Sequence, residues 1–370
     1  MKKEFSLYLD LVRFLAAVVV LVNHANHRGI ITEVLPQYGH SAVMVFFLLS
    51  GYVIAYVTSE KERVPRDYAV SRLARIYSVA PVALIVTLLA DTFGQMIGMR
   101  FYEGVATNDF VPLRFFTSLF FLNEIWTVSI TSFSNVPYWS LNYEVWYYVM
   151  FGVFMFMQGR ARVIVLVMIC LLLGPKVLLL APIWWMGVYL YHSRFWAGIG
   201  VSVGWIAFVG SLVAIVLFHQ YGVEKTLKVW LESQIGEQPY HLLAYSRSFI
   251  SDWLLGALVF LNFAGFRAIA HQFGAVLTAF ARPIRYLAGY TFVLYLTHQP
   301  LIWFFATLID GSPDTSLYLW QVLACVIVTV WLLGQVTERR KGFYRGLSER
   351  IVDVAESLWV RARLLAGGKA

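Results

Sequence analysis

The chain has 370 residues, of which 59% are hydrophobic and only 14% are charged, and its mean hydropathy is +0.68. A soluble globular protein has about 45–50% apolar and about 25% charged residues. This composition therefore excludes a soluble enzyme, a disordered chain and a secreted disulfide scaffold, and it indicates a polytopic membrane protein. The net charge of +8 does not require nucleic acid as a partner, because the basic residues of membrane proteins gather on the cytoplasmic side, where they attract anionic lipid.

Ten apolar runs approach the length of about 20 residues that a membrane-spanning helix needs. In chain order they cover residues 7–22, 42–57, 77–97, 138–157, 163–174, 177–191, 196–218, 249–266, 287–308 and 317–336. None shows the period of two that is typical of a membrane β-barrel, so helices are predicted. The fold class is an all-α polytopic helical bundle of about ten transmembrane helices. The fifth and sixth runs form either two short helices or one helix broken at Gly174-Pro175.

The distribution of basic residues predicts the orientation of the bundle. If the N-terminus is cytoplasmic, the inside segments hold about three times as many Lys and Arg residues as the outside segments, as the positive-inside rule requires. We therefore expect both termini in the cytoplasm and the chain in the cell inner (plasma) membrane. Residues 1–338 form the transmembrane domain, and residues 339–370 form a basic amphipathic cytoplasmic tail. An interfacial helix is predicted at residues 115–122.

The first span carries three ionisable residues, and such residues are costly in lipid and therefore candidates for function. Asp10 and Arg13 share one helix face near the cytoplasmic end and can pair with each other. His24 lies eleven residues beyond Arg13, which is about 16 Å along the helix axis. His24 is therefore expected near the outer end, and the alternative role for it is that of a solvated histidine at a helix end.

Polar residues recur in the fourth and ninth spans. Ser140 and Glu144 are one helical turn apart, with Asn142 between them. His298 lies about 18 Å along the ninth span, counted from the cytoplasmic side. We expect His24, Glu144 and His298 at similar depth, in one polar cavity that opens towards the outer leaflet. The alternatives are a structural, hydrogen-bonded Glu144 and a packing role for His298.

Two arginines lie on the cytoplasmic side, directly before the third span. Arg72 and Arg75 are three residues apart, so their guanidinium groups share one helix face. Paired guanidinium groups favour a phosphate site. The alternative is a positive-inside anchor without a ligand.

These segments together resemble the acyltransferase-3 family of integral membrane acyltransferases. The matching segments are Arg13 to His24 for the family's Arg-x10-His helix, residues 45–54 for its FFxLSG segment, Arg72 to Tyr77 for its RxxRIxP segment with the proline displaced to Pro81, Ser140 to Glu144 for its Ser-x3-Glu motif, and residues 290–298 for its late YLxH segment. Their order, their spacing and the predicted topology agree with the family over nearly all of the chain.

The resemblance implies transfer of an acyl group, usually acetyl, from cytoplasmic acyl-CoA to a hydroxyl of an extracytoplasmic or lipid-linked glycan, such as a sugar of lipopolysaccharide or exopolysaccharide. It implies that Arg13, Arg72 and Arg75 bind the phosphates of CoA. His24 is the expected general base. The resemblance leaves open a ping-pong route in which His24 or Ser140 first takes the acyl group.

The resemblance implies supporting roles for the other polar residues of the spans. Glu144 is expected to orient the imidazole of His24 or to hold the acceptor. Asp10, Asn142 and His298 are assigned to substrate binding. The reaction needs no metal, and no cluster of metal ligands is seen in the sequence. The expected partners are acyl-CoA, a glycan or lipid-linked sugar, and membrane lipid, and a homo-oligomer is left open.

Two other classes of protein share some of these features. A proton-coupled transporter also carries His and Glu in its membrane helices, but the sequence shows no internal repeat of the kind transporters have. A non-enzymatic membrane component of polysaccharide assembly is the second alternative. Thiol release from acyl-CoA would distinguish the enzyme from both.

Overall fold

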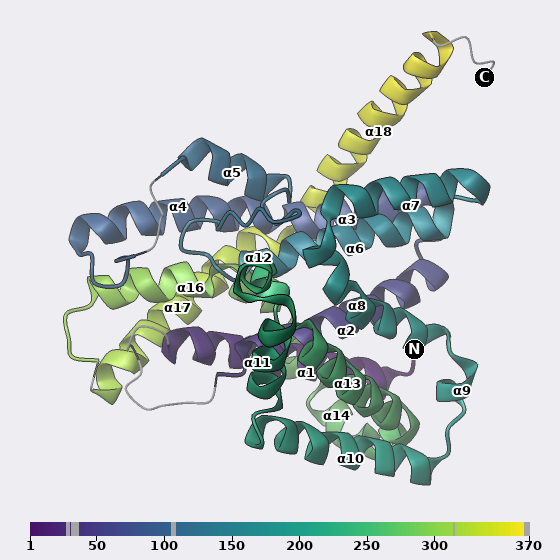
Figure 1. The fold of residues 1–370 in the computed structure, drawn as a ribbon, viewed down its shortest axis with the longest axis horizontal. Helices are drawn as coiled ribbons and strands as arrows, with labels where there is room; N and C mark the ends of the chain where they lie inside the picture. Colours follow the sequence, from purple (N-terminus) through teal and green to yellow (C-terminus); the bar gives the residue numbers. More distant parts are fainter. Residues whose placement is uncertain (27–29, 31–36, 105–108, 314, 366–370) are drawn as a thin grey trace.

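The protein is described from a computed structural model, which covers residues 1–26, 30, 37–104, 109–313 and 315–365. Within these ranges the chain is helical and forms no strand, so the all-α prediction is confirmed (Figure 1). The helices are α1 (Lys3–Asn26), α2 (Gly39–Glu60), α3 (Pro65–Tyr77), α4 (Ala80–Ile97), α5 (Val111–Leu119), α6 (Tyr138–Phe156), α7 (Gly159–Leu173), α8 (Pro175–His192), α9 (Arg194–Ala197), α10 (Val201–Gln220), α11 (Val223–Ile235), α12 (Glu237–Leu242), α13 (Phe249–Ile269), α14 (Gly274–Ala279), α15 (Ala281–Ala288), α16 (Thr291–Leu308), α17 (Ser316–Val336) and α18 (Lys341–Leu365).

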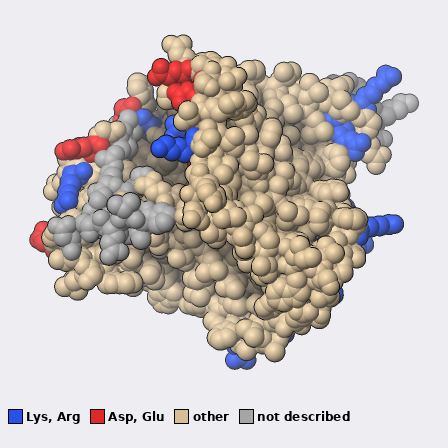
Figure 2. All heavy atoms as spheres, turned by 60° about the horizontal axis from the view of Figure 1, so that its bottom comes forward, with Lys and Arg blue, Asp and Glu red and all other residues tan. Residues whose placement is uncertain are grey.

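Six helical stretches of the described chain are long and apolar enough to cross a membrane, judged by length and composition. They contain α1, α2, α4, α10, α13 and α17. The other four predicted spans coincide with the helices α6, α7, α8 and α16. Figure 2 shows one face of the molecule on which the charged side chains lie around the rim, while the centre is uncharged. Such a surface is typical of a protein that meets lipid.

Residues 163–191 form two helices rather than one broken helix. The chain turns at Gly174, whose φ of +75° favours glycine. The next residue is Pro175, and proline is favoured in the first turn of a helix. The backbone and ring of Trp126 occupy the space that a side chain at Gly174 would need. The sequence therefore specifies the break, and the loop before α6 packs against it through Trp126.

Close backbone contact joins α2 and α8. A Cβ atom on Gly51 would overlap the carbonyl of Trp184, and one on Gly187 would overlap the carbonyl of Leu48. Small residues let membrane helices approach in this way, and the gain is dispersion contact along both helices. The pair α10 and α13 also packs extensively, and α16 packs against α1, α4 and α17. Neighbouring helices therefore hold α2 and α16 in place from several sides, and these two helices line much of the pocket described below.

The two segments predicted to lie outside the bundle are helical in the structure. Helix α5 begins at Val111 and ends at Leu119, so it starts earlier and ends earlier than the predicted interfacial helix. Helix α18 forms most of the predicted tail, and residues 366–370 lie outside the described residues. It packs beside α3, where Arg66 pairs with Asp353 at 2.6 Å, and then projects away from the bundle (Figure 1).

Candidate active site

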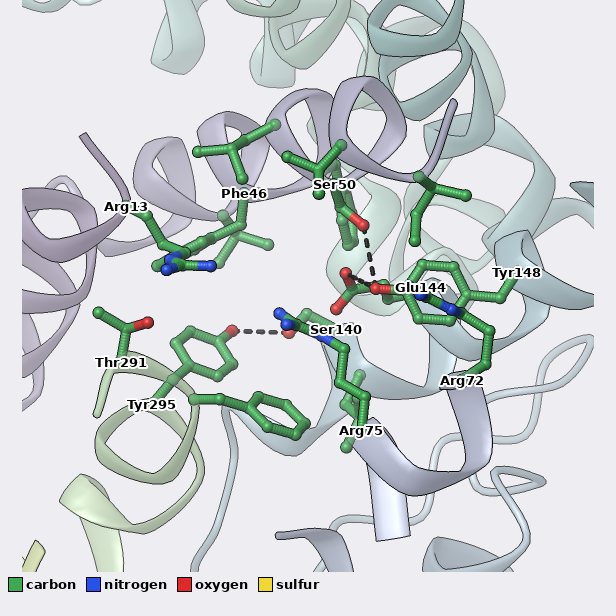
Figure 3. Close-up of a pocket in the computed structure, with 17 residues that line it drawn as sticks. Arg13, Phe46, Ser50, Arg72, Arg75, Ser140, Glu144, Tyr148, Thr291 and Tyr295 are labelled. Atoms are coloured by element: carbon green, nitrogen blue, oxygen red, sulfur yellow. Dashed lines mark hydrogen bonds between the residues drawn. The ribbon is translucent and has the colours of Figure 1, made fainter. Parts of the chain in front are cut away.

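A polar pocket opens between five helices of the bundle: α1, α2, α3, α6 and α16 (Figure 3). Its polar lining residues are Arg13, Ser50, Arg72, Arg75, Ser140, Glu144, Tyr148, Thr291 and Tyr295. The remaining lining residues are apolar side chains, most of them from α2. Apolar walls with converging polar groups are typical of a small-molecule site.

Arg72 is held at the pocket wall by an acidic and an aromatic partner. Its Nη2 donates to both carboxylate oxygens of Glu62, at 2.8 and 3.0 Å. Its guanidinium lies 5.6 Å from the ring centre of Tyr68 and 5.7 Å from that of Tyr148. Its buried Nε has no hydrogen-bond partner among the described residues. A buried donor without a partner is costly, so this group can gain from an added acceptor.

Arg13 shows the same pattern on the opposite wall. Its guanidinium donates to Asp10 at 2.8 Å, as the spacing of these two residues predicts, and to the carbonyl of Ala288 at 3.2 Å. Its Nε is also buried, and within the described part of the chain no acceptor meets it. Asp10 thus neutralises part of the charge of Arg13, and it is not among the residues that line the pocket.

A second cavity continues the basic surface from Arg13, Arg72 and Arg75 towards α18. The two cavities share these three arginines together with Val53 and Phe292. The second cavity adds Ser71, Ser78, Glu338, Lys341 and Arg345 to the lining. Together the cavities form a basic path, lined by five Lys and Arg side chains and by the carboxylates of Glu144 and Glu338. This excess of positive charge suits a ligand with several phosphates.

Lys341 and Arg345 are basic lining residues that the sequence analysis assigned only to a tail. They lie at positions i and i+4 of α18, so both face the same side of the helix. The signal that could have found them is this spacing, directly after the last apolar run. Glu338, next to them, accepts a hydrogen bond from the backbone N–H of Val293, in the first turn of α16. This contact fixes the start of α18 against the helix that carries His298.

Glu144 lies in the pocket with the arginines. The hydroxyl of Tyr148 donates to its carboxylate, and Tyr148 is in turn 3.1 Å from the hydroxyl of Ser50. Trp184 donates to the same Ser50 at 3.2 Å. Glu144 therefore belongs to a hydrogen-bond network that connects α6, α2 and α8.

Ser140 lines the same pocket one helical turn before Glu144, as their spacing predicts. Its hydroxyl lies 2.6 Å from the hydroxyl of Tyr295 and 3.1 Å from the carbonyl of Pro137. Tyr295 is also in ring contact with His298, at a centre distance of 6.1 Å. Tyr295 therefore lies between the pocket and the histidines.

His24 and His298 meet in direct contact although 274 positions separate them in the chain. The Nδ1 of His24 lies 3.1 Å from the Nε2 of His298. Neither histidine is among the residues that line the pocket. One cavity shared by His24, Glu144 and His298 was expected. The structure instead joins the two histidines and places Glu144 with the arginines, because the face of α6 that carries Glu144 is turned towards α2 and α3.

Asn142 points away from this pocket. It is fully buried, and its amide donates to the side chain of Asn123 at 3.0 Å. The contact ties α6 to the loop before it. The structure therefore does not bring Asn142 together with the other predicted site residues.

A proline in α16 positions the histidine region. Pro300 has no N–H, so it cannot bond the carbonyl of Leu296 four residues earlier. The amide of Asn135 donates to that carbonyl instead, at 2.6 Å. The same amide group donates to Thr87 of α4 at 3.1 Å. The loop before α6 thus completes the hydrogen bonding of α16 within one turn of His298.

Among the described residues, no group of three or more His, Cys, Asp or Glu side chains is placed to hold a metal ion.

Comparisons with known proteins support the family that the motifs indicate. A family model described as "Acyltransferase domain", that of the acyltransferase-3 family, matches residues 6–334. The chain is 28% identical over 127 residues to the exopolysaccharide production protein ExoZ of Rhizobium meliloti (strain 1021), and this match covers 34% of the chain and 37% of the relative. No solved structure matches. The chain belongs to the acyltransferase-3 family, whose model covers nearly its whole length.

Proposed function

We propose that the protein is a membrane O-acyltransferase that moves an acyl group, here taken as acetyl, from cytoplasmic acyl-CoA to a hydroxyl of an extracytoplasmic or lipid-linked glycan. The family supports the acyl transfer. The name of the relative, an exopolysaccharide production protein, supports a glycan as acceptor. The observation that carries the proposal is the basic pocket, in which Arg13 and Arg72 each retain a buried Nε donor without a partner in the described chain.

We propose ten membrane spans in the inner membrane, with both termini in the cytoplasm. The spans are α1, α2, α4, α6, α7, α8, α10, α13, α16 and α17. In this arrangement α3 and α18 lie on the cytoplasmic side, where acyl-CoA is present. The histidine pair lies in the outer half of the membrane, nearer to a glycan acceptor.

The donor enters from the side of α18. The phosphates of CoA are bound along the basic path by Arg72, Arg75 and Arg13, with Lys341 and Arg345 at its entrance. Phosphate oxygens would supply the acceptors that the buried Nε atoms of Arg13 and Arg72 lack. The chain of CoA is long and flexible, and its thioester end extends into the pocket past Ser140 and towards the histidines.

His24 is the general base in this proposal. Its imidazole removes the proton from the acceptor hydroxyl, the oxygen bonds to the thioester carbonyl carbon, the carbon–sulfur bond breaks and the CoA thiolate leaves. In the alternative ping-pong route, the Ser140 oxygen bonds to the thioester carbonyl carbon, the carbon–sulfur bond breaks and CoA leaves, with Tyr295 as a path for the serine proton. The acceptor hydroxyl then attacks the acyl-serine ester, and Ser140 is released with its proton restored.

The test uses purified protein in lipid vesicles with radiolabelled acetyl-CoA and glycan from the host envelope. We expect release of CoA thiol together with label in the glycan. His24→Ala should lower turnover about 10²–10⁴-fold, the usual contribution of a general base. Ser140→Ala should have little effect in direct transfer and abolish turnover in the ping-pong route. If His24→Ala turns over at nearly the wild-type rate, His24 is not the general base. If the wild type releases no thiol, a transporter or an assembly component is favoured.

A further inference from the structure

The structure assigns His298 as the positioning residue for His24: its ring nitrogen fixes the tautomer and the ring orientation of the proposed base. The inference rests on the proposed function, because it concerns the base of that reaction. It differs from the sequence prediction, which gave the orienting role to Glu144 and substrate binding to His298.

The tautomer of His298 follows from its own helix. The Nδ1 of His298 lies 3.0 Å from the carbonyl oxygen of Leu294, one turn earlier in α16. A carbonyl oxygen can only accept, so Nδ1 carries the hydrogen. In a neutral ring the lone pair is then on Nε2, the nitrogen that faces His24.

The tautomer of His24 follows from two acceptors on the same nitrogen. The Nδ1 of His24 lies 2.9 Å from the carbonyl oxygen of Val20 and 3.1 Å from the Nε2 of His298. Both neighbours accept, so Nδ1 of His24 carries the hydrogen. The lone pair of the neutral ring is therefore on Nε2, and Nε2 is the atom that takes the proton from the acceptor hydroxyl.

The reverse arrangement is unfavourable at both rings. If His298 donated from Nε2, the lone pairs of both Nδ1 atoms would face the carbonyl oxygens of Leu294 and Val20. A doubly protonated His298 would place its Nε2–H against the Nδ1–H of His24. His298 therefore stays neutral while His24 gains and loses its proton.

The contact between the rings also strengthens during the reaction. When His24 takes a proton, its Nδ1–H becomes the donor of a charged group, and such hydrogen bonds are about twice as strong as neutral ones. His298 thus stabilises the imidazolium that forms in the transition state. This resembles the way a carboxylate supports the histidine of a hydrolase triad, with a neutral ring as the acceptor.

The surroundings of His298 hold its side chain in one position. Its side chain is 1% exposed, and the Asn135 amide holds the carbonyl of Leu296 beside it. Glu144, in contrast, receives its hydrogen bond from Tyr148 and lines the basic pocket. The acceptor that the base needs is therefore supplied by α16 and not by α6.

The experiment compares His298→Leu, His298→Gln and His298→Asn in the vesicle assay. Leucine removes the acceptor, so we expect kcat about 10- to 100-fold lower, with KM for acetyl-CoA unchanged. The amide oxygen of glutamine can reach the place of Nε2, whereas that of asparagine is one methylene short. The Gln variant should therefore recover most of kcat, and the Asn variant should remain close to the Leu variant. Thr297→Val is the matched control, because Thr297 is buried next to His298 and its hydroxyl, among the described residues, bonds only to Val293 of its own helix.

The outcomes separate this inference from the proposed function. Transfer by the wild type and its loss in His24→Ala establish the reaction without reference to His298. If kcat of His298→Leu then equals that of the wild type, or if the Gln variant is as slow as the Asn variant, the positioning role is wrong and the base remains. If the Leu variant is not recovered in folded form, the difference between Gln and Asn decides alone.

Discussion

Two of the regions in which the molecule buries charged groups treat the charge differently. In the basic pocket, Arg13 and Arg72 each keep a buried Nε without a partner in the described chain, next to open volume. At the start of α8, Lys176 and Glu124 form an ion pair at 2.7 Å, and each side chain is 1% exposed. Both regions remove charge from water, but of the two only the basic pocket leaves hydrogen-bond donors without a partner in the described chain.

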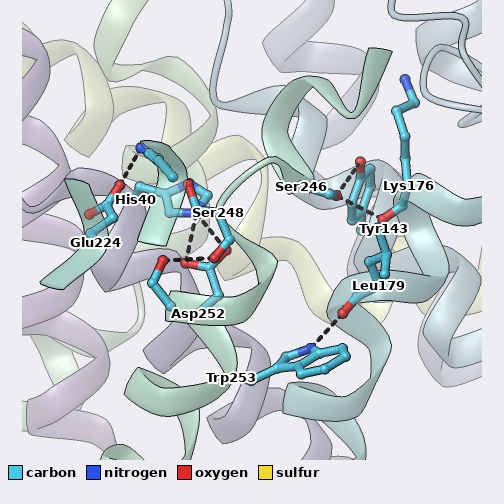
Figure 4. A network of polar contacts seen from close by, with 11 residues as sticks. His40, Tyr143, Lys176, Leu179, Glu224, Ser246, Ser248, Asp252 and Trp253 are labelled. Atoms are coloured by element: carbon cyan, nitrogen blue, oxygen red, sulfur yellow. Dashed lines mark hydrogen bonds and ion pairs between the residues drawn. The ribbon is translucent and has the colours of Figure 1, made fainter. Parts of the chain in front are cut away.

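Every charged side-chain atom of the ion pair at α8 has a hydrogen-bond partner. Lys176 also donates to the carbonyl of Val128 at 2.6 Å, and Ser129 donates to the second oxygen of Glu124 at 2.5 Å. The backbone carbonyl of Lys176 accepts from Ser246 at 2.7 Å, a contact visible in Figure 4. The pair therefore ties the loop after α5, the start of α8 and the turn before α13 to one another.

The difference separates structural charge from charge that serves a ligand. A buried pair whose charged atoms all have partners offers little to a further molecule, and the loss of one partner leaves an uncompensated charge. A buried arginine with an unused donor at a cavity can gain from an anion. Variants of the basic pocket should therefore lower the affinity for acyl-CoA, whereas variants of the ion pair should lower the stability of the fold.

The largest effect is expected from Arg72→Glu combined with Arg75→Glu. Each lost charge-assisted contact is worth about 1.5–3 kcal/mol, so the affinity for acyl-CoA should fall by two orders of magnitude or more, because about 1.4 kcal/mol corresponds to tenfold. Binding of labelled acetyl-CoA to the purified protein measures this. The control is Arg160→Glu with Arg282→Glu, two exposed arginines outside both cavities. Equal affinities of the two double variants would restore the interpretation of Arg72 and Arg75 as an anchor.

Lys176→Met should act on stability instead. Removing one partner of a buried pair costs about 3–5 kcal/mol, so the thermal midpoint and the folded yield should fall. Acyl-CoA affinity of the remaining folded protein should be unchanged. The double variant Lys176→Met with Glu124→Leu should regain part of the stability, since it removes both charges. A Lys176→Met protein of normal stability but weakened acyl-CoA binding would place this pair in the site and erase the distinction.

The smallest effect is expected at the entrance of the basic path. Lys341→Gln and Arg345→Gln remove charges on the solvent side of the second cavity, where each contact is worth about 0.2–1 kcal/mol. KM for acetyl-CoA should rise by a factor of a few, and the rise should vanish at high salt, because salt screens exposed charges. Arg350→Gln, farther along α18 and outside the lining, is the control. A rise in KM that salt does not alter would show that these residues are buried with the ligand.

The sequence was sufficient for the fold class and for many of the pocket residues. Apolar runs and their lengths follow directly from the demands of a bilayer, and the spacing of Ser140 and Glu144 placed both on one face. The contact between His24 and His298 could not be predicted, because it depends on how α16 packs against α1. Helical spacing likewise could not show that Glu144 faces the arginines, or that Asn142 turns towards a loop.

The hydrogen bond from Asn135 to the carbonyl of Leu296 has a consequence for the order of assembly. Chains are made from the N-terminus, so His24 is synthesised early, whereas Leu296 and His298 emerge only after most of the bundle. Until α16 is inserted, the side chain of Asn135 lacks the carbonyl of Leu296, and His24 lacks the ring of His298. The proposed catalytic centre is therefore completed only late in biosynthesis, and a truncated chain in the membrane would contain the proposed base without the group proposed to orient it.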